Sequence, residues 1–182
     1  MEGRIGRLFV AVPLPDEVRM ALADRLGPKA VPGKAVPPQN WHITLRFLGT
    51  TDQVAYERFL AALDQVLLGP EFEIELGEMG AFPRPRSATV IWLAVTKGRD
   101  RLGELATETE EAAQVAGFAP EERPFRPHLT LSRVRPPEDV TGRIEGSGVA
   151  GIGWRCRSIV VYRSHPGRGV WYEPLETFPL RG

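Results

Sequence analysis

The sequence lacks the features that would set this chain apart from soluble globular proteins. Cys156 is the only cysteine among 182 residues, which excludes an intrachain disulfide and a paired-cysteine metal site, so we expect a reducing, cytoplasmic setting. No apolar run approaches the length of a signal-peptide core or a membrane span, so no membrane partner is expected. Lys plus Arg and Asp plus Glu both number 23. Net charge therefore does not indicate DNA binding, and any anion site must be local.

The sequence does contain short β-forming runs that alternate with amphipathic segments, and its 42% hydrophobic content is enough to bury a core. Glycine and proline mark most of the boundaries between these segments. Strands are expected at 7–14, 42–49, 71–82, 88–95, 128–134, 155–164 and 169–180, and helices at 15–26, 56–67 and 102–116.

Two of the three histidines occur in the same short phrase, "HITL" at 42–45 and "HLTL" at 128–131. Each phrase closes a longer repeat of apolar strand, amphipathic helix, proline-rich connection and His-x-Thr strand, over roughly 7–49 and 88–134. Such a duplication predicts an α+β fold in which residues 1–182 form a single bilobal domain. We expect two pseudo-symmetric lobes, each a mainly antiparallel sheet with helices on its outer face, facing a central groove. A C-terminal hairpin is expected at 155–180.

Strand geometry predicts what the two phrases offer, because residues i and i+2 point to the same face. His42 therefore shares a face with Thr44, and His128 shares one with Thr130. The alternate positions are expected to face the cores of the lobes: Ile43, Leu45, Phe47, Leu129 and Leu131. Two imidazoles on opposite walls of a groove can take a proton on one side and give one on the other. This arrangement suits in-line displacement at phosphorus, with the threonine hydroxyls donating to the non-bridging oxygens.

Two alternatives compete with catalysis. A single His-x-Thr pair is more often a structural feature than a catalytic one, but its repetition at matching places in two halves is hard to attribute to packing. Metal binding is the second alternative. Two histidines with no carboxylate or thiolate at ligand spacing make a poor zinc site, so we expect neither a metal nor another cofactor.

Longer stretches around the two phrases resemble a known family. They are "RLFVAVPLP" at 7–15, "GAFPRPR" at 80–86, "RPFRPHLTLSRV" at 123–134 and "YRSHPGRGVWYEPLETFPL" at 162–180. Together with the two phrases they resemble the two-histidine phosphoesterase superfamily, and within it the RNA 2',3'-cyclic phosphodiesterases of the LigT/ThpR type, formerly called 2'-5' RNA ligases. The resemblance implies metal-independent hydrolysis of a 2',3'-cyclic phosphate to a 2'-phosphate, with 2'-5' RNA ligation as a side activity.

The same resemblance implies roles for the residues of the two phrases. His128 would be the general base that activates water, and His42 the general acid that protonates the departing 3'-oxygen. Pseudo-symmetry makes the two histidines nearly equivalent in sequence, so the residues by themselves do not show which histidine is the acid and which is the base. Thr44 and Thr130 would bind phosphate oxygens, and Arg133 matches the family's phosphate-binding arginine.

Strict alternation places Arg133 on the same face as the core residues of its strand. The strand must therefore end, twist or bulge for the guanidinium to reach the groove. Phe47 occupies the equivalent position in the first repeat. Its ring is expected either to pack in the core or to bind substrate by stacking on a base.

Other polar residues carry less specific expectations. Arg46 falls on the face of His42 and would either add phosphate affinity or point out of the groove. Arg84 and Arg86 would guide an RNA backbone or stay solvated, and Arg126 would line the rim of the groove. His165 lies in "SHPGRG", a turn signal, and is expected to be a solvent-exposed loop residue.

The expected partners are RNA ends or nucleotides that carry a 2',3'-cyclic phosphate, and a monomer suffices because both motifs lie in one chain. Three alternatives stay open: an RNA-end binding module without turnover, a metal-dependent phosphoesterase, and a cyclic phosphodiesterase acting on a nucleotide-sugar metabolite. A pure binding module would need cationic or aromatic groups rather than two titratable partners.

Overall fold

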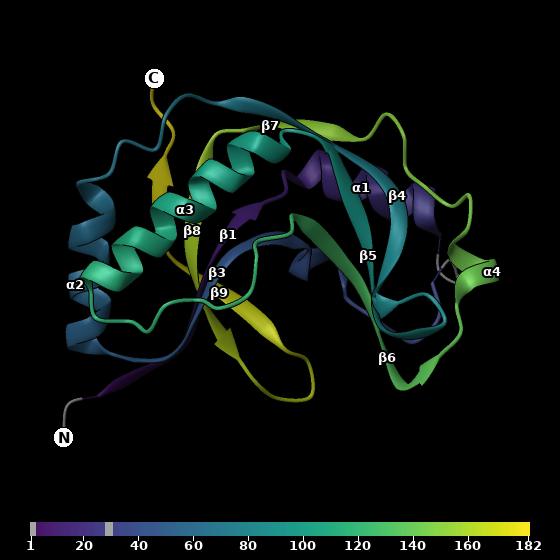
Figure 1. Ribbon diagram of the computed structural model, residues 1–182, viewed down its shortest axis with the longest axis horizontal. Helices are drawn as coiled ribbons and strands as arrows, with labels where there is room; N and C mark the ends of the chain where they lie inside the picture. Colours follow the sequence, from purple (N-terminus) through teal and green to yellow (C-terminus); the bar gives the residue numbers. More distant parts are fainter. Residues whose placement is uncertain (1–2, 28–30) are drawn as a thin grey trace.

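The alternation of β-forming and amphipathic runs produces nine strands and four α-helices in the computed structural model, which describes residues 3–27 and 31–182 (Figure 1). In chain order the elements are β1 (Arg4–Pro13), α1 (Asp16–Leu26), β2 (Lys34–Ala35), a single 3-10 turn η1 (Pro38–Asn40), β3 (His42–Asp52), α2 (Gln53–Asp64), β4 (Phe72–Arg84), β5 (Ser87–Lys97), α3 (Arg99–Val115), β6 (His128–Glu138), α4 (Thr141–Ile144), β7 (Gly153–Cys156), β8 (Ser158–His165) and β9 (Trp171–Pro179).

The strands form one antiparallel sheet in the order β7-β4-β5-β6-β3-β1-β8-β9, with the short β2 paired to β6. The central joint lies between β6 and β3, where Ile43 pairs with Leu129. On either side of this joint the strands occur in equivalent order, because β5 lies beside β6 as β1 lies beside β3. The predicted α+β class with mainly antiparallel pairing is therefore confirmed.

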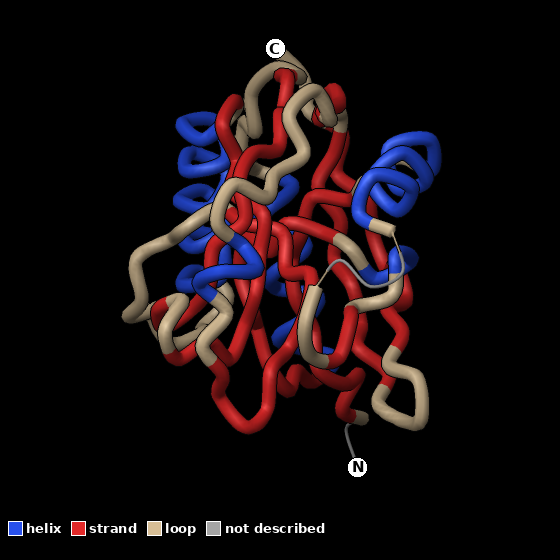
Figure 2. Tube along the Cα trace, turned by 90° about the vertical axis from the view of Figure 1, so that its right-hand side faces the viewer, coloured by secondary structure: helices blue, strands red, loops and turns tan. Residues whose placement is uncertain are grey.

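The helices cover the sheet from outside, as Figure 2 shows for the helical segments on the two flanks of the strands. Helix α3 packs on α2 and on β3, so the helix of the second repeat covers the His-x-Thr strand of the first repeat. Helix α1 lies near β4 in Figure 1, and Arg25 at its C-terminal end donates a hydrogen bond of 3.3 Å to the carbonyl of Ala150.

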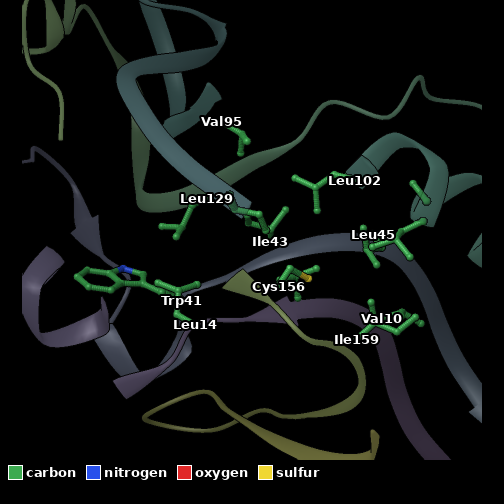
Figure 3. Packing of buried hydrophobic residues seen from close by; sticks show 14 of the residues in the cluster. Val10, Leu14, Trp41, Ile43, Leu45, Val95, Leu102, Leu129, Cys156 and Ile159 are labelled. Atoms are coloured by element: carbon green, nitrogen blue, oxygen red, sulfur yellow. The ribbon is translucent and has the colours of Figure 1, made fainter. Parts of the chain in front are cut away.

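The main core lies between these helices and the sheet. Ile43 and Leu129 are fully buried there, beside Leu102 of α3 and Val95 of β5 (Figure 3). Full burial of an aliphatic side chain of this size stabilises a fold by about 1.5–3 kcal/mol. The alternate apolar positions of the His-x-Thr strands thus anchor both strands to one core.

One predicted strand differs from the structure. Residues 155–164 were expected to form a single strand, but the chain turns at Arg157 and separates β7 from β8. Strand β7 pairs with β4 in one half of the sheet, whereas β8 pairs with β1 in the other and forms the hairpin with β9. Both segments are apolar and rich in β-formers, so sequence alone gives no sign that they belong to opposite ends of one sheet.

None of the helices within residues 3–27 and 31–182 combines the length and the apolar character that a bilayer crossing needs.

Candidate active site

The two predicted histidines meet at the joint between the halves of the sheet. Because Ile43 pairs with Leu129 in antiparallel register, His42 lies next to Thr130, and His128 lies next to Thr44. All four polar side chains are half-buried and alternate with fully buried aliphatic ones. They share the face of the sheet opposite the helices, which we call the histidine face.

Each histidine is oriented by the backbone carbonyl two residues before it. His42 Nδ1 lies 2.8 Å from the carbonyl oxygen of Asn40, and His128 Nδ1 lies 2.6 Å from that of Arg126. A carbonyl oxygen only accepts, so Nδ1 carries the proton in both rings, and Nε2 of the neutral ring is left with a lone pair. His42 Nε2 lies 2.9 Å from Thr44 Oγ1. Both Nε2 atoms are therefore the ones that can exchange a proton with a substrate.

Burial disfavours the protonated form of both imidazoles and lowers the pKa of each. It lowers the pKa of His42 to about 4; the Asn40 carbonyl opposes this shift, while the charges of His128 and Arg133 add to it. The pKa of His128 is also lowered, again mainly by burial and further by Arg133, although the Arg126 carbonyl raises it. Desolvation disfavours the charged form of an imidazole. An anion bound beside the rings would stabilise the protonated form and so raise the pKa of both histidines.

A β-bulge in each His-x-Thr strand changes which side chains reach the histidine face. In β3, Thr44 and Arg46 pair with the consecutive residues Ala11 and Val10, so Leu45 is the extra residue. A bulge places two consecutive side chains on one face and thereby reverses the alternation beyond it. Arg46 is consequently buried on the helix side, at 8% exposure, whereas Phe47 is 61% exposed.

The second bulge lies at the equivalent place in β6. Thr130 and Ser132 pair with Trp92 and Ile91, which leaves Leu131 as the extra residue. Ser132 is fully buried and its hydroxyl donates to the carbonyl of Pro32. The following residue, Arg133, is exposed, and its charge acts on both histidines as described above. The bulge that a phosphate-binding Arg133 required is therefore present.

The segment around Gly33 and Lys34 packs very closely against β6 at the second bulge. Lys34 pairs with Arg133, and a Cβ atom at Gly33 would lie only 2.6 Å from the Arg133 carbonyl oxygen. With φ at 89°, Gly33 also adopts a backbone conformation that favours glycine. This close approach lets the chain before β2 support the strand directly behind Arg133.

Two predictions about side-chain direction were wrong, and the first bulge explains both. Phe47 does not face the core, since its ring lies 6.0 Å from that of Phe9, which in turn lies 4.9 Å from the His42 ring. Arg46 does not share the face of His42 and Thr44 but points toward α3. The strict period of two holds only as far as Leu45.

Aromatic side chains that sequence reasoning missed surround both histidines. Beside His42 lie Phe9 and Tyr172, with ring centroids at 4.9 and 5.3 Å. Beside His128 lie Phe82 at 5.0 Å and Trp92 at 6.3 Å. Phe9 and Trp92 could have been found from alternation along their own strands, because the positions between their aliphatic neighbours must face away from the core. Tyr172 is brought in only by the β8–β9 hairpin.

The remaining polar candidates lie around the site or away from it. Arg84 and Arg86 are exposed at the turn between β4 and β5, and Arg126 is exposed while its carbonyl orients His128. The expectation of a solvent-exposed loop for His165 was wrong. It ends β8, stacks on Trp171 at 4.1 Å, and its Nε2 lies 2.8 Å from a carboxylate oxygen of Glu173.

Within the described part of the chain, no group of three or more His, Cys, Asp or Glu side chains lies close enough together to hold a metal ion.

Residues 14–168 match the model of a family described as the 2'-5' RNA ligase superfamily. A curated relative from Aeropyrum pernix, named RNA 2',3'-cyclic phosphodiesterase, is 37% identical over 63% of this chain and 64% of its own length. A relative of the same name from Methanothermobacter thermautotrophicus is 34% identical over 96% of this chain and 98% of its own. Among solved structures, E. coli LigT complexed with 3'-AMP superposes with a TM-score of 0.78 at 26% identity, over 99% of this chain and 100% of that one.

Proposed function

This chain belongs to the 2'-5' RNA ligase superfamily, and we propose that it hydrolyses the 2',3'-cyclic phosphate of RNA ends or nucleotides to a 2'-phosphate without a metal ion. The full-length relatives named RNA 2',3'-cyclic phosphodiesterase support the reaction class. The observation that carries the proposal is the pair of imidazoles on one face, each fixed through Nδ1 by a carbonyl so that Nε2 carries the lone pair. A substrate phosphate would replace the contact of 2.9 Å that His42 Nε2 makes with Thr44 Oγ1.

In the proposed reaction the cyclic phosphate lies between the two Nε2 atoms. His128 takes a proton from a water molecule as its oxygen attacks phosphorus, and the bond from phosphorus to the 3'-oxygen breaks. His42 gives a proton to that departing oxygen, so the product carries a 3'-hydroxyl and a 2'-phosphate. Positioned acid-base catalysis of this kind contributes about 10²–10⁴-fold per group.

Three further residues are proposed to hold the phosphate. Arg133 can make charge-assisted hydrogen bonds to two oxygens at once. Thr44 and Thr130 lie next to the histidines on the same face. Once a phosphate displaces the contact between Thr44 Oγ1 and His42 Nε2, both hydroxyls can donate to oxygens on which charge builds. On the side of His42, the exposed ring of Phe47 lies beside the buried ring of Phe9. This arrangement favours stacking of the terminal base on Phe47.

The burial of His42 bears directly on its assignment as the acid. With a pKa of about 4 it is neutral near pH 7, so the acid role requires that the bound phosphate raise this pKa. A cyclic substrate with sulfur in place of the 3'-oxygen separates the roles, because a thiolate leaves without protonation. We expect His42→Ala to approach the wild-type rate on this analogue while His128→Ala stays slow; the reverse pattern would exchange the two roles.

Ligation through a 2'-5' linkage follows from the same site when the 5'-hydroxyl of a second RNA replaces water as the nucleophile. We further propose that the protein acts as a cytoplasmic monomer, in keeping with its single buried cysteine and with a site assembled within one chain.

Product analysis tests the proposal. An oligoribonucleotide ending in a 2',3'-cyclic phosphate is incubated with the protein in EDTA, and the 2'-phosphate, 3'-phosphate and unreacted ends are separated by chromatography. We expect the 2'-phosphate alone, and none with a double His42→Ala, His128→Ala variant purified in parallel to detect contaminating nucleases. An unreacted end that nevertheless binds tightly would mark a recognition module. Turnover of a cyclic phosphate on a nucleotide-sugar but not of the oligoribonucleotide would instead favour the metabolite substrate.

A further inference from the structure

We propose that Arg46 is a positioning residue that holds the first β-bulge and so keeps Phe47 on the histidine face, where it sets the affinity for the nucleoside part of a ligand. This inference rests on the proposed function for the identity of the ligand, but its geometry and its test do not require turnover.

The guanidinium of Arg46 is buried and its contacts are all internal. Its Nε donates to a carboxylate oxygen of Glu110 on α3, Nη1 donates to the carbonyl of Phe47 at 2.5 Å, and Nη2 donates to the carbonyl of Ala119 at 2.5 Å. A buried charge destabilises a fold unless it is paired and hydrogen-bonded. The pairing here is specific to the bulged conformation, because regular alternation would turn Arg46 away from Glu110 and toward the histidines.

The partner carboxylate is fixed in turn. Glu110 accepts 2.9 Å hydrogen bonds from the side-chain amide of Gln114 and from the backbone N–H of Glu121. Burial would raise the pKa of Glu110, but the hydrogen bonds from Arg46, Glu121 and Gln114 outweigh it and the pKa is lowered. The first bulge is therefore tied to helix α3 and to the segment that follows it.

The same segment connects the first bulge to His128. From Ala119, which accepts from Arg46, the chain runs to Arg126, whose carbonyl orients His128. Arg46 thus connects the backbone of Phe47, five residues beyond His42 along β3, to the connection that leads into the second His-x-Thr strand. The equivalent position in β6 is Ser132, which has a single neutral bond to Pro32.

The ring of Phe47 depends on this anchor for its direction. The ring centroid of Phe47 lies 6.0 Å from that of Phe9, and Phe47 is 61% exposed. Packing alone therefore does not hold the ring in place. The Phe47 carbonyl, by contrast, is held from the helix side by Arg46. Loss of that hydrogen bond would leave the backbone free to return to regular pairing, which places residue 47 on the helix side.

A double-mutant cycle tests the proposal by binding. The affinities of adenosine 2'-monophosphate and of inorganic phosphate are measured for the wild type, Arg46→Met, Phe47→Ala and the double variant. Loss of a stacked base is expected to weaken nucleotide binding by about 5- to 150-fold. We expect Arg46→Met to weaken nucleotide binding at least about 5-fold on that scale, to leave phosphate binding unchanged, and to add nothing in the Phe47→Ala background.

A matched control removes another partly buried arginine that is tied to backbone carbonyls. Arg101 of α3 donates to the carbonyls of Leu68 and Pro70, so Arg101→Met should lower stability without changing the affinity for either ligand. Should Arg46→Met not fold, Glu110→Gln weakens the same anchor and is expected to give a smaller loss in the same direction. Additive effects, or equal losses of nucleotide and phosphate binding, would overturn the proposal, as would unchanged nucleotide binding in a folded Arg46→Met. Absence of hydrolysis by the wild type would instead contradict the proposed function, but it would not affect the comparison of binding affinities among these variants.

Discussion

Ile43 of β3 lies directly opposite Leu129 of β6, and both side chains are fully buried where the two halves of the sheet join. This pairing determines which side chains come together in the candidate active site. Because each aliphatic residue is anchored in the core, the residues on either side of it must point to the opposite face. The histidine and threonine of each phrase are thereby brought together from positions 86 residues apart in the chain.

The first prediction concerns this joint. Ile43→Ala is expected to lower the free energy of unfolding by about 2–5 kcal/mol, because it removes buried methyl groups and leaves a cavity. Urea unfolding monitored by tryptophan fluorescence measures the change, and Leu67→Ala is the control because Leu67 is 75% exposed. A cost below about 1 kcal/mol for Ile43→Ala, the range of tolerated core swaps, would contradict a tightly packed joint.

The second prediction concerns Phe47. Since its ring is 61% exposed, Phe47→Ala should leave the melting temperature nearly unchanged while raising KM for a nucleoside 2',3'-cyclic phosphate by about 5- to 150-fold, the range for one base stacked on an aromatic ring. The control is Phe9→Ala, which removes a ring that is only 4% exposed and should lower stability. A drop in melting temperature for Phe47→Ala without a change in KM would assign the ring to packing.

The third prediction concerns Arg133. Arg133→Met is expected to raise KM about 10- to 150-fold, the equivalent of losing charge-assisted hydrogen bonds worth about 1.5–3 kcal/mol. Arg133→Lys should recover only part of this loss, because an ammonium does not bind two oxygens in a fork. The exposed Arg143→Met on α4 serves as the control for charge removal. Equal KM values for the Arg133 and Arg143 variants would argue against a phosphate-binding role.

The fourth prediction concerns protonation. In NMR titrations His42 should show a pKa of about 4 in the free protein, and saturating phosphate should raise it because the anion favours imidazolium. Unfolded His42 has a pKa near 6.5, so between about pH 4 and 6.5 the unfolded chain binds more protons. The contribution of His42 to stability is therefore present above pH 6.5 and falls as the pH drops toward 4. A free-protein pKa near 6.5 would contradict the burial of this ring.

Much of the fold could be predicted because its determinants are local. The helix at 102–116 was predicted from apolar residues at helical spacing, and Leu102, Leu105 and Ala113 are indeed buried. The face shared by His42 and Thr44 followed from the period of two along a strand. Both patterns depend only on residues a few positions apart.

The parts that could not be predicted depend on pairing between distant segments. Nothing in "HITLRF" shows that Leu45 is an extra residue opposite Ala11 and Val10, so Arg46 and Phe47 were assigned to the wrong faces. A bulge before Arg133 was anticipated only because the role expected of Arg133 required one. Likewise, Tyr172 reaches His42 through the β8–β9 hairpin, and its sequence context contains no sign of that proximity.

The central claim is that two histidines catalyse the hydrolysis without a metal ion, and its most direct test is a rate measurement. The initial rate on an oligoribonucleotide with a 2',3'-cyclic phosphate end is compared, in EDTA, for the wild type, His42→Ala, His128→Ala and His165→Ala. We expect full wild-type activity in EDTA, losses of about 10²-fold or more for the first two variants, and no loss for His165→Ala. Hydrolysis that stops in EDTA, or that survives the loss of either His42 or His128, would contradict the account.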